Sequence, residues 1–263
     1  MKMVNIRGVE LGAGVPKTIV PIVARTKAAI IEKAKEINTL PADLVEWRAD
    51  FYEDLFSTPK LLETLKELRG TLGNTPILFT IRTKPEGGEV APSFEDYANA
   101  NLSVAKSGNA DLVDVEMFWG NTDWRGQVSD VSAKLTAEIH AAKCLVVGSR
   151  HNFAATPAKS DIVTALKNQQ DAGADIPKAA VMPTSKDDVM ELLSASYEFA
   201  GKYSDRPFLT ISMGPKGMIT RVACELSGSC MTFGAAGQVS APGQIQVGDL
   251  KAMLELVHKS SQE

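Results

Sequence analysis

One lysine inside an apolar segment offers the clearest chemistry in this sequence. Lys178 is followed by Ala-Ala-Val-Met, and a proline stands on either side of the segment, at Pro177 and Pro183. Because proline cannot donate to a β-sheet ladder, we expect the two prolines to mark the ends of a short strand, Lys178 to Met182. A lysine on such a strand either reaches solvent at the strand edge or is a desolvated amine, and a desolvated amine is a nucleophile toward a ketone.

His151 is the candidate base. His140 and His258 fall in segments of helical period, where we expect surface positions, whereas His151 directly follows the apolar run Cys144 to Arg150, which predicts a buried strand. A neutral imidazole, with an ordinary pKa of about 6.5, can remove the proton next to an iminium carbon. The lysine and this histidine together predict Schiff-base proton abstraction beside a ketone.

Further charged residues end the other apolar runs or lie in the loops after them. Residues two apart on a strand share a face, so Glu46 can point inward with Arg48, and Asp114 with Glu116. The other candidates are Arg82, Glu86, Arg221, Ser240 and Gln244. Burial and the three arginines would favour a neutral lysine amine. An arginine without a partner suits a substrate carboxylate.

Each of these residues also has an ordinary structural interpretation. Glu46 and Arg48 can form an ion pair inside the fold, and Asp114 and Glu116 can neutralise nearby arginines. Glu86 can be a solvated charge in its glycine-rich loop. Arg221 can be a charge on a helix surface, and Ser240 and Gln244 lie among ordinary turn residues.

Bringing these side chains together requires a fold in which many strand ends meet. Apolar, β-branched runs recur about every 20 to 35 residues, with segments of helical period between them. The predicted strands are Thr18–Ala24, Leu44–Arg48, Ile77–Arg82, Leu112–Phe118, Cys144–Arg150, Lys178–Met182, Phe208–Met213 and Met231–Ala235. Eight such repeats predict a (β/α)₈ TIM barrel, whose active site lies at the carboxyl ends of the strands. An open doubly wound sheet is the alternative, but no GxGxxG follows the first run.

Local signals support the same architecture. Val4 to Thr18, which contains three glycines, predicts an N-terminal β-hairpin. Thr58 before Pro59 predicts a helix N-terminus, and Ser93 three residues before Asp96 predicts another. The absence of a linker or low-complexity segment predicts one catalytic domain over residues 1–263.

Composition limits the function classes. The chain has 263 residues, 44% of them hydrophobic, and a net charge of −4, which gives no basic field for nucleic acid. No run is long enough to span a membrane, and we expect no signal peptide, which predicts a cytoplasmic protein. The three cysteines have no metal-binding spacing and are expected to be buried in a reducing compartment.

The chain resembles type I 3-dehydroquinate dehydratase over nearly its whole length. The stretches that carry the resemblance are Glu46-Trp-Arg48, Phe79-Thr-Ile-Arg82, Glu86-Gly-Gly-Glu89, Ser149-Arg-His-Asn-Phe153, Thr156-Pro157, Lys178-Ala-Ala-Val-Met-Pro183, Ser212-Met-Gly214 and Ser240-Ala-Pro-Gly-Gln244. The resemblance implies a TIM barrel, usually a homodimer, that uses no metal or cofactor. It also implies syn dehydration of 3-dehydroquinate to 3-dehydroshikimate in the shikimate pathway of aromatic amino acid biosynthesis. Quinate breakdown stays open as an alternative role.

The resemblance further implies the role of each residue. Lys178 would form the imine, His151 would act as base and then acid, and Glu86 would orient His151. Arg221 would bind the substrate carboxylate. The remaining substrate-binding residues would be Glu46, Arg48, Arg82 and, in a loop that closes over the substrate, Ser240 and Gln244.

Two departures from the family pattern have expected consequences. Pro21 replaces a small polar residue of the first barrel strand, so that hydroxyl contact is lost. Arg150 and Asn152 flank His151, and we expect a cation there to depress the pKa of His151.

Two rival functions remain at this stage. A lysine-imine aldolase or transaldolase would be expected to offer amide-lined phosphate sites in the last loops, where this sequence has Arg221, Ser240 and Gln244. A ligand-binding barrel without turnover would need neither Lys178 nor His151.

Overall fold

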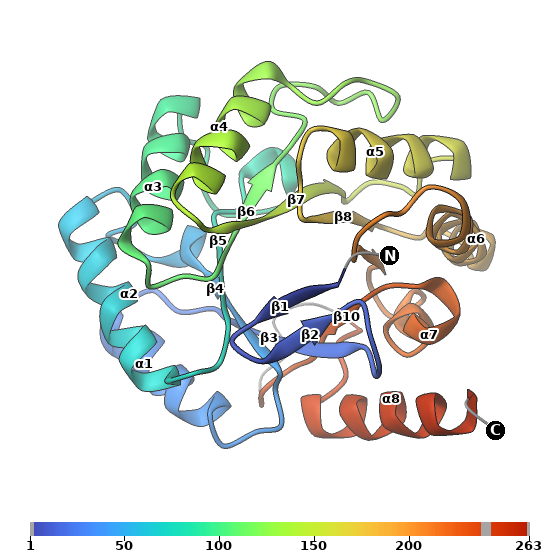
Figure 1. Cartoon of the computed structure of the whole chain (residues 1–263), viewed down its shortest axis with the longest axis horizontal. Coiled ribbons are helices and arrows are strands. Elements are labelled where there is room, and N and C mark those ends of the chain that lie inside the picture. Colours follow the sequence, from blue (N-terminus) through green and yellow to red (C-terminus); the bar gives the residue numbers. More distant parts are fainter. Residues whose placement is uncertain (1–2, 238–242, 262–263) are drawn as a thin grey trace.

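Parallel strands and helices alternate along the chain and form a barrel. The computed structural model describes residues 3–237 and 243–261, and in these residues eight strands alternate with eight helices (Figure 1). The strands are β3 (Lys17–Ile22), β4 (Leu44–Arg48), β5 (Ile77–Thr80), β6 (Leu112–Glu116), β7 (Leu145–Asn152), β8 (Ile176–Val181), β9 (Leu209–Ser212) and β10 (Met231–Phe233). The helices are α1 (Lys27–Ile37), α2 (Thr58–Leu72), α3 (Phe94–Ser107), α4 (Asp130–Ala141), α5 (Lys159–Asp171), α6 (Lys186–Lys202), α7 (Cys224–Ser227) and α8 (Val247–Ser261). The predicted (β/α)₈ barrel is confirmed.

The sheet closes almost completely. The strand order is β10-β3-β4-β5-β6-β7-β8-β9, and each neighbouring pair is parallel. In the described residues no ladder joins β9 to β10. That seam is bridged by the Cys230 N–H, which donates to the Phe208 carbonyl at 2.8 Å, and by the Thr210 N–H, which donates to Ser229 Oγ at 3.2 Å.

The core has an inner and an outer layer. The outer layer fills the space between strands and helices and holds the largest buried rings, such as Trp47, Phe79 and Tyr97. The inner layer lies inside the barrel near the amino ends of the strands, where Leu44, Leu112 and their counterparts meet. Buried aliphatic side chains from every barrel strand thus make this end of the barrel a packed core.

The predicted N-terminal hairpin is present, and it covers the amino end of the barrel. It consists of β1 (Val4–Ile6) and β2 (Val9–Leu11), and Figure 1 shows it lying across the ring of strands. Its buried Ile6 and Leu11 belong to the same apolar cluster as the inner barrel residues. The opposite end is therefore the end left for a ligand.

The helix signals were largely correct. The Ser93 side chain accepts from the Asp96 N–H and begins α3 as expected. The helix N-terminus predicted at Thr58 and Pro59 is that of α2, but Thr58 is the first residue of this helix and not its N-cap, which is Ser57. The three cysteines are buried and unbonded to one another, as expected.

Of the eight predicted strands only Leu44–Arg48 has both ends as predicted, and three of the differences concern the site. Pro177 lies inside β8, which begins at Ile176; proline lacks only the N–H, so its carbonyl and extended φ still suit a parallel strand. β5 ends at Thr80, so Arg82 lies two residues beyond the strand. β7 continues to Asn152, so His151 lies within the strand and not after it.

No helix among the described residues combines the length and apolar character that crossing a membrane requires.

Candidate active site

The predicted functional residues meet at the carboxyl end of the barrel. A cavity of about 110 Å³ is lined by residues from seven of the strands or the segments that follow them. Of the nine residues predicted, eight line this cavity, namely Glu46, Arg48, Arg82, Glu86, His151, Lys178, Arg221 and Gln244. The ninth, Ser240, lies outside the described residues. Strand ends from all around a barrel converge in this way, which is why residues distant in the sequence share one site.

Strand alternation explains which side chains enter the cavity. In β7 and β8, Ser149 lies opposite Lys178 and His151 lies opposite Ala180. Successive side chains on a strand point to opposite faces, so Ser149 and His151 face the barrel interior while Arg150 faces the helices. The lysine and the histidine thereby reach one cavity from neighbouring strands.

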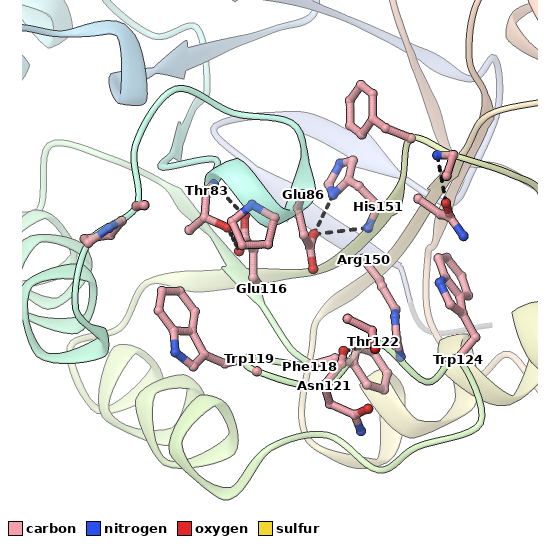
Figure 2. Close-up of a pocket in the computed structure, with 17 residues that line it drawn as sticks. Thr83, Glu86, Glu116, Phe118, Trp119, Asn121, Thr122, Trp124, Arg150 and His151 are labelled. Atoms are coloured by element: carbon pink, nitrogen blue, oxygen red, sulfur yellow. Dashed lines mark hydrogen bonds and ion pairs between the residues drawn. The ribbon is translucent and has the colours of Figure 1, made fainter.

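His151 is held by Glu86, which lies in the short helix η2 (Lys84–Glu86). Glu86 Oε2 is 2.8 Å from His151 Nδ1 and also accepts from the backbone N–H of His151, at 3.1 Å (Figure 2). Arg82 Nη1 is 3.5 Å from the same oxygen. An oxygen surrounded by N–H donors is an acceptor, so Nδ1 carries the proton and Nε2 keeps its lone pair.

The electrostatics keep this histidine neutral. Burial lowers the pKa of His151 well below its ordinary value, and Arg82, Lys178 and Arg48 lower it further. Burial, together with the charge of Glu116, raises the pKa of Glu86 well above the usual range, although Arg82 opposes the shift. An uncharged imidazole with a free Nε2 is ready to accept a proton.

Lys178 is almost fully buried, and its amine meets a carboxylate. Its Nζ donates to Asp114 Oδ2 at 3.2 Å and lies 5.1 Å from the centre of the Phe233 ring. Asp114 also accepts from Ser149 Oγ at 2.6 Å and pairs with Arg82 at 2.7 Å. Burial alone would raise the pKa of Asp114, but Arg82 and Lys178 outweigh it, and the pKa is lowered. Asp114 thus stays anionic and fixes the position of the amine.

Arg82 is neutralised by two acidic side chains. Besides Asp114 it pairs with Glu116 at 2.9 Å, and Glu116 in turn accepts from the hydroxyl of Thr83 at 2.6 Å. Burial would lower the pKa of Arg82, but Asp114 and Glu116 raise it well above its ordinary value. The interpretation of Asp114 and Glu116 as groups that neutralise an arginine fits this geometry.

Arg48 and Glu46 both line the cavity but do not pair with each other. Arg48 makes a two-bond contact with Asp50, with Nε and Nη2 each 2.8 Å from a carboxylate oxygen. Glu46 accepts from the hydroxyl of Thr80 at 2.9 Å. The possible Glu46–Arg48 ion pair is therefore wrong, because Asp50, two residues beyond Arg48, takes its place.

Arg221 is the least neutralised cation of the cavity. It lies in η3 (Met218–Arg221), after β9, and its Nη1 donates to the Phe233 carbonyl at 3.2 Å. Among the described residues it has no carboxylate partner, and its buried Nε has no hydrogen-bond partner. Burial lowers the pKa of Arg221 to about 10. A buried guanidinium in this condition would bind an incoming carboxylate strongly.

Arg150 does not face the base. Figure 2 shows the His151 ring and the Arg150 side chain directed to different sides of β7. The Arg150 guanidinium lies 3.9 Å from the centre of the Phe118 ring and donates to the Asn121 carbonyl at 3.1 Å. The expected depression of the His151 pKa is found, but burial and the cations Arg82, Lys178 and Arg48 cause it.

Two further observations complete the surroundings. Pro21 lines the cavity and offers it no hydroxyl, as predicted. A second cavity of about 570 Å³, drawn in Figure 2, adjoins the first and shares Glu86, His151 and Phe153 with it. Its other walls include Trp119 and Trp124.

Sequence reasoning missed two residues that organise the site. Asp50 orients Arg48, and Ser149 links Asp114 to Arg82, donating to the former and accepting from the latter at 2.9 Å. Ser149 precedes His151 by two on β7 and therefore shares its face, a spacing that could have indicated it. Asp50 lies beyond the end of β4, in the short helix η1 (Ala49–Phe51), where strand alternation gives no signal.

The arrangement is suited to chemistry at a carbonyl group. It combines a buried amine, a neutral imidazole with a free nitrogen, and an arginine able to receive a carboxylate. Among the described residues, no cluster of three or more His, Cys, Asp or Glu side chains is arranged to hold a metal ion.

Comparison with known proteins gives one consistent result. The family model for type I 3-dehydroquinase matches residues 18–261. The 3-dehydroquinate dehydratase of Bacillus licheniformis is 44% identical over 259 residues, which are 98% of this chain and 99% of the relative. That of Listeria welshimeri is 46% identical over the same shares of both chains.

Solved structures agree with these relatives. A crystal structure of type I 3-dehydroquinate dehydratase from Clostridium difficile with covalently modified comenic acid has a TM-score of 0.93 and 41% identity, covering 98% of this chain and 99% of that one. The 3-dehydroquinate dehydratase of Geobacillus kaustophilus has a TM-score of 0.91 and 34% identity, covering 99% and 98%. A 3-deoxy-D-arabino-heptulosonate 7-phosphate synthase from Thermotoga maritima, at 10% identity and a TM-score of 0.56, shares the fold alone.

Proposed function

The chain belongs to the type I 3-dehydroquinase family and is thus a hydro-lyase of the shikimate pathway, and we propose that it dehydrates 3-dehydroquinate through an imine on Lys178. The observation that carries this proposal is the shared cavity of Lys178 and His151, reached from neighbouring strands. A buried amine and a neutral imidazole in one cavity are the two groups that imine-assisted proton abstraction requires.

Imine formation is the first part of the proposed reaction. The Lys178 amine attacks the ketone carbon of the substrate through its nitrogen lone pair, and the resulting carbinolamine takes up one proton from solvent and loses water to give the iminium. Asp114, 3.2 Å from Nζ, orients the amine. Arg221 binds the substrate carboxylate, and Glu46 and Arg48 contact its hydroxyl groups. Positioning of this kind replaces a bimolecular encounter by an intramolecular step.

Elimination is the second part. The iminium draws electrons from the adjacent carbon, and Nε2 of His151 removes the C2 proton. The electron pair forms the C1–C2 double bond as the C1 hydroxyl departs. His151, now an imidazolium, donates its proton to that hydroxyl, so that water leaves on the same face. A second water molecule then hydrolyses the imine and releases 3-dehydroshikimate and the free amine.

Glu86 and Arg82 support these steps without reacting. Glu86 holds the tautomer of His151 through the 2.8 Å contact to Nδ1. Arg82 adds positive charge that keeps His151 neutral before the reaction. Ser240 and Gln244 are assigned to the loop that closes over the substrate and excludes water.

Other properties of the family extend the proposal to the assembly. We expect residues 1–263 to act as one catalytic domain in a homodimer in the cytoplasm, without a cofactor and without nucleic acid as a partner. Light scattering on the purified protein measures the mass and tests the dimer directly.

A borohydride trap tests the proposed function. Reduction in the presence of 3-dehydroquinate should attach one substrate-derived group to Lys178, because borohydride converts the imine to a stable secondary amine. Peptide mapping identifies the labelled residue. A label on another residue of active enzyme, or none, would remove the imine mechanism.

His151→Ala is the matched variant for that trap. It should still be labelled on Lys178 but lose roughly 10²–10⁴-fold in turnover, since the imine forms without this base and the C2 proton does not leave. Product absorbance gives the turnover and also separates an enzyme from a barrel that only binds. Near-wild-type turnover in His151→Ala would assign the base to another group.

A further inference from the structure

A helix side chain holds the backbone of the reactive lysine. Gln169, in α5, is completely buried, and its amide uses both of its ends on one residue. Gln169 Nε2 donates to the Lys178 carbonyl at 3.1 Å, and the Lys178 N–H donates to Gln169 Oε1 at 2.8 Å. Both backbone polar groups of Lys178 thus bond to a single side chain.

These two bonds fix the direction of the lysine side chain. The N–H and the carbonyl of Lys178 belong to the two peptide units on either side of its Cα. Holding both units restrains φ and ψ of that residue, and therefore the direction of the Cα–Cβ bond. α5 packs on the outside of β8, while the lysine side chain enters the cavity inside the barrel.

The two bonds from Gln169 lie at a point of β8 where the strand has fewer backbone donors. Pro177, directly before Lys178, has no N–H and so removes one donor from the strand at this point. At the far end of the side chain, Nζ meets Asp114 at 3.2 Å. The lysine is therefore fixed at its backbone by Gln169 and at its tip by Asp114.

We propose that Gln169 is a positioning residue for imine formation, whose amide sets the backbone of Lys178 so that Nζ enters the cavity beside His151. The inference rests on the proposed function, because it assumes that Lys178 is the nucleophile. Gln169 is buried outside the barrel and does not line the cavity, so it acts through Lys178 and not on the substrate.

The chain supplies a matched control in the next residue. Gln170 belongs to the same helix and also bonds two backbone groups with its amide. Its Nε2 donates to the Tyr203 carbonyl at 3.1 Å, and its Oε1 accepts from the Asp205 N–H at 3.1 Å. Gln170 therefore has the same hydrogen-bonding pattern as Gln169, but on the segment after α6, away from Lys178.

The experiment compares Gln169→Met with Gln170→Met. Methionine has a similar length and an unbranched side chain, so each variant removes two hydrogen bonds with little change in volume. The rate of imine formation is measured by rapid mixing with 3-dehydroquinate and quenching with borohydride, scored as label on Lys178 per folded molecule. The isotope effect of deuterium at C2 on turnover is measured in parallel.

We expect Gln169→Met to form the imine roughly 10- to 100-fold more slowly, because a misplacement of about 1 Å has consequences of this size. Its C2 isotope effect should be smaller than that of the wild type, since imine formation then limits turnover. Gln170→Met should lose stability but keep the wild-type rate and isotope effect. A purely structural role of Gln169 would leave the isotope effect unchanged.

Distinct outcomes separate the two proposals. Absence of label on wild-type Lys178 would refute the proposed function itself. A labelled wild type with an equally fast Gln169→Met, or with equal slowing in both methionine variants, would overturn the role of Gln169 alone.

If Gln169→Met does not fold, Gln169→Glu gives the answer. An ionised glutamate still accepts from the Lys178 N–H but cannot donate to its carbonyl, whereas a protonated one can do both. The rate of imine formation relative to wild type should rise as the pH falls. A rate of imine formation that falls relative to wild type as the pH falls would contradict the proposal.

Discussion

At the scale of single residues, the site depends on one carboxylate oxygen. Glu86 Oε2 accepts from both Nδ1 and the backbone N–H of His151. The backbone donor cannot move away, so the oxygen facing His151 must remain an acceptor whatever the charge of Glu86. The tautomer of His151 is thus fixed by geometry, and the charge on Glu86 contributes less.

Glu86→Gln and Glu86→Leu should therefore differ. Glutamine can place its oxygen toward both donors, so we expect turnover to fall roughly tenfold or less, whereas leucine leaves Nδ1 unheld and should approach the 10²–10⁴-fold loss of the base itself. Steady-state kcat of both variants at pH 7 checks this. Equal losses would mean that the charge of Glu86, and not its oxygen, is required.

The pH profile follows from the same residue. A base whose pKa is lowered stays neutral to lower pH than a free imidazole does. We therefore expect kcat/KM to stay constant through about pH 6.5, where a free imidazole becomes protonated, and to fall only at a pH well below that value. The measurement is kcat/KM for 3-dehydroquinate between pH 4 and 9. An acidic limb centred at or above about 6.5 would contradict the burial and cation effects on His151.

At the scale of elements, the loop after β5 sets the place of Glu86. Gly87 has φ of 85° and ends η2, and the ring of Phe153 fills the space where a Cβ of Gly87 would stand. At Gly88 a Cβ would lie 1.9 Å from the Arg82 carbonyl oxygen. Because neither glycine carries a Cβ, this loop can pass close to Arg82 and Phe153, which leaves Glu86 beside His151.

Gly88→Ala should impair catalysis through this loop. The added methyl collides with backbone that cannot rotate away, so the loop and Glu86 must shift, and we expect turnover to fall roughly 10- to 100-fold. The control is Gly70→Ala in α2, where a Cβ meets nothing within 4 Å and where alanine favours the helix by about 1 kcal/mol. Parallel kcat and thermal unfolding measurements decide; wild-type kcat in Gly88→Ala would show that the loop adapts.

Elements were predictable from sequence to the extent that local patterns govern them. Apolar, β-branched runs located all eight strands, because buried parallel strands require such runs on both faces. Their ends were less predictable: Pro177 was expected to lie just before β8, but it lies within the strand, because the ladder tolerates one missing N–H. The Glu86–His151 contact was proposed from the family resemblance, because residues 65 positions apart leave no local signal of pairing.

Gln169 shows what a pattern can reveal and what it cannot. Ile162, Leu166 and Gln169 lie three and four residues apart, on one buried stripe of α5. A glutamine on that stripe indicates a buried amide that needs partners. That Lys178 provides both partners depends on how α5 packs on β8, which the spacing within a helix does not contain.

At the scale of the whole molecule, stability and catalysis occupy opposite ends of the barrel. The hairpin and the first residues of the strands form the inner apolar cluster, whereas the charged residues gather at the carboxyl ends. Eight repeats along the chain made this architecture predictable, because each βα unit places its strand end at the same face. The closure of the barrel between β9 and β10 left no comparable signal.

Leu11→Ala should lower stability without changing substrate binding. Leu11 is fully buried against the inner barrel, so its truncation should lower the free energy of unfolding by about 2–5 kcal/mol. KM should stay unchanged in the folded protein, because the hairpin does not line the cavity. Urea unfolding measures the free energy of unfolding, and steady-state kinetics measure KM. The control is Glu10→Ala, on the exposed side of β2, which should change the free energy of unfolding by no more than about 0.5 kcal/mol. A raised KM would mean that the two ends of the barrel are coupled.

The β9–β10 seam has a consequence for how the enzyme responds to its own substrate. Arg221 spans the seam at the carboxyl end, reaching from the segment after β9 to the Phe233 carbonyl of β10. Local opening of the barrel is expected to start where no ladder holds two strands, and the amide protons there should exchange first with solvent. A carboxylate bound to Arg221 restrains that side chain across the gap, so an occupied barrel should open less often than an empty one. The arginine that would bind the substrate carboxylate would in this way also help to hold the barrel closed between β9 and β10.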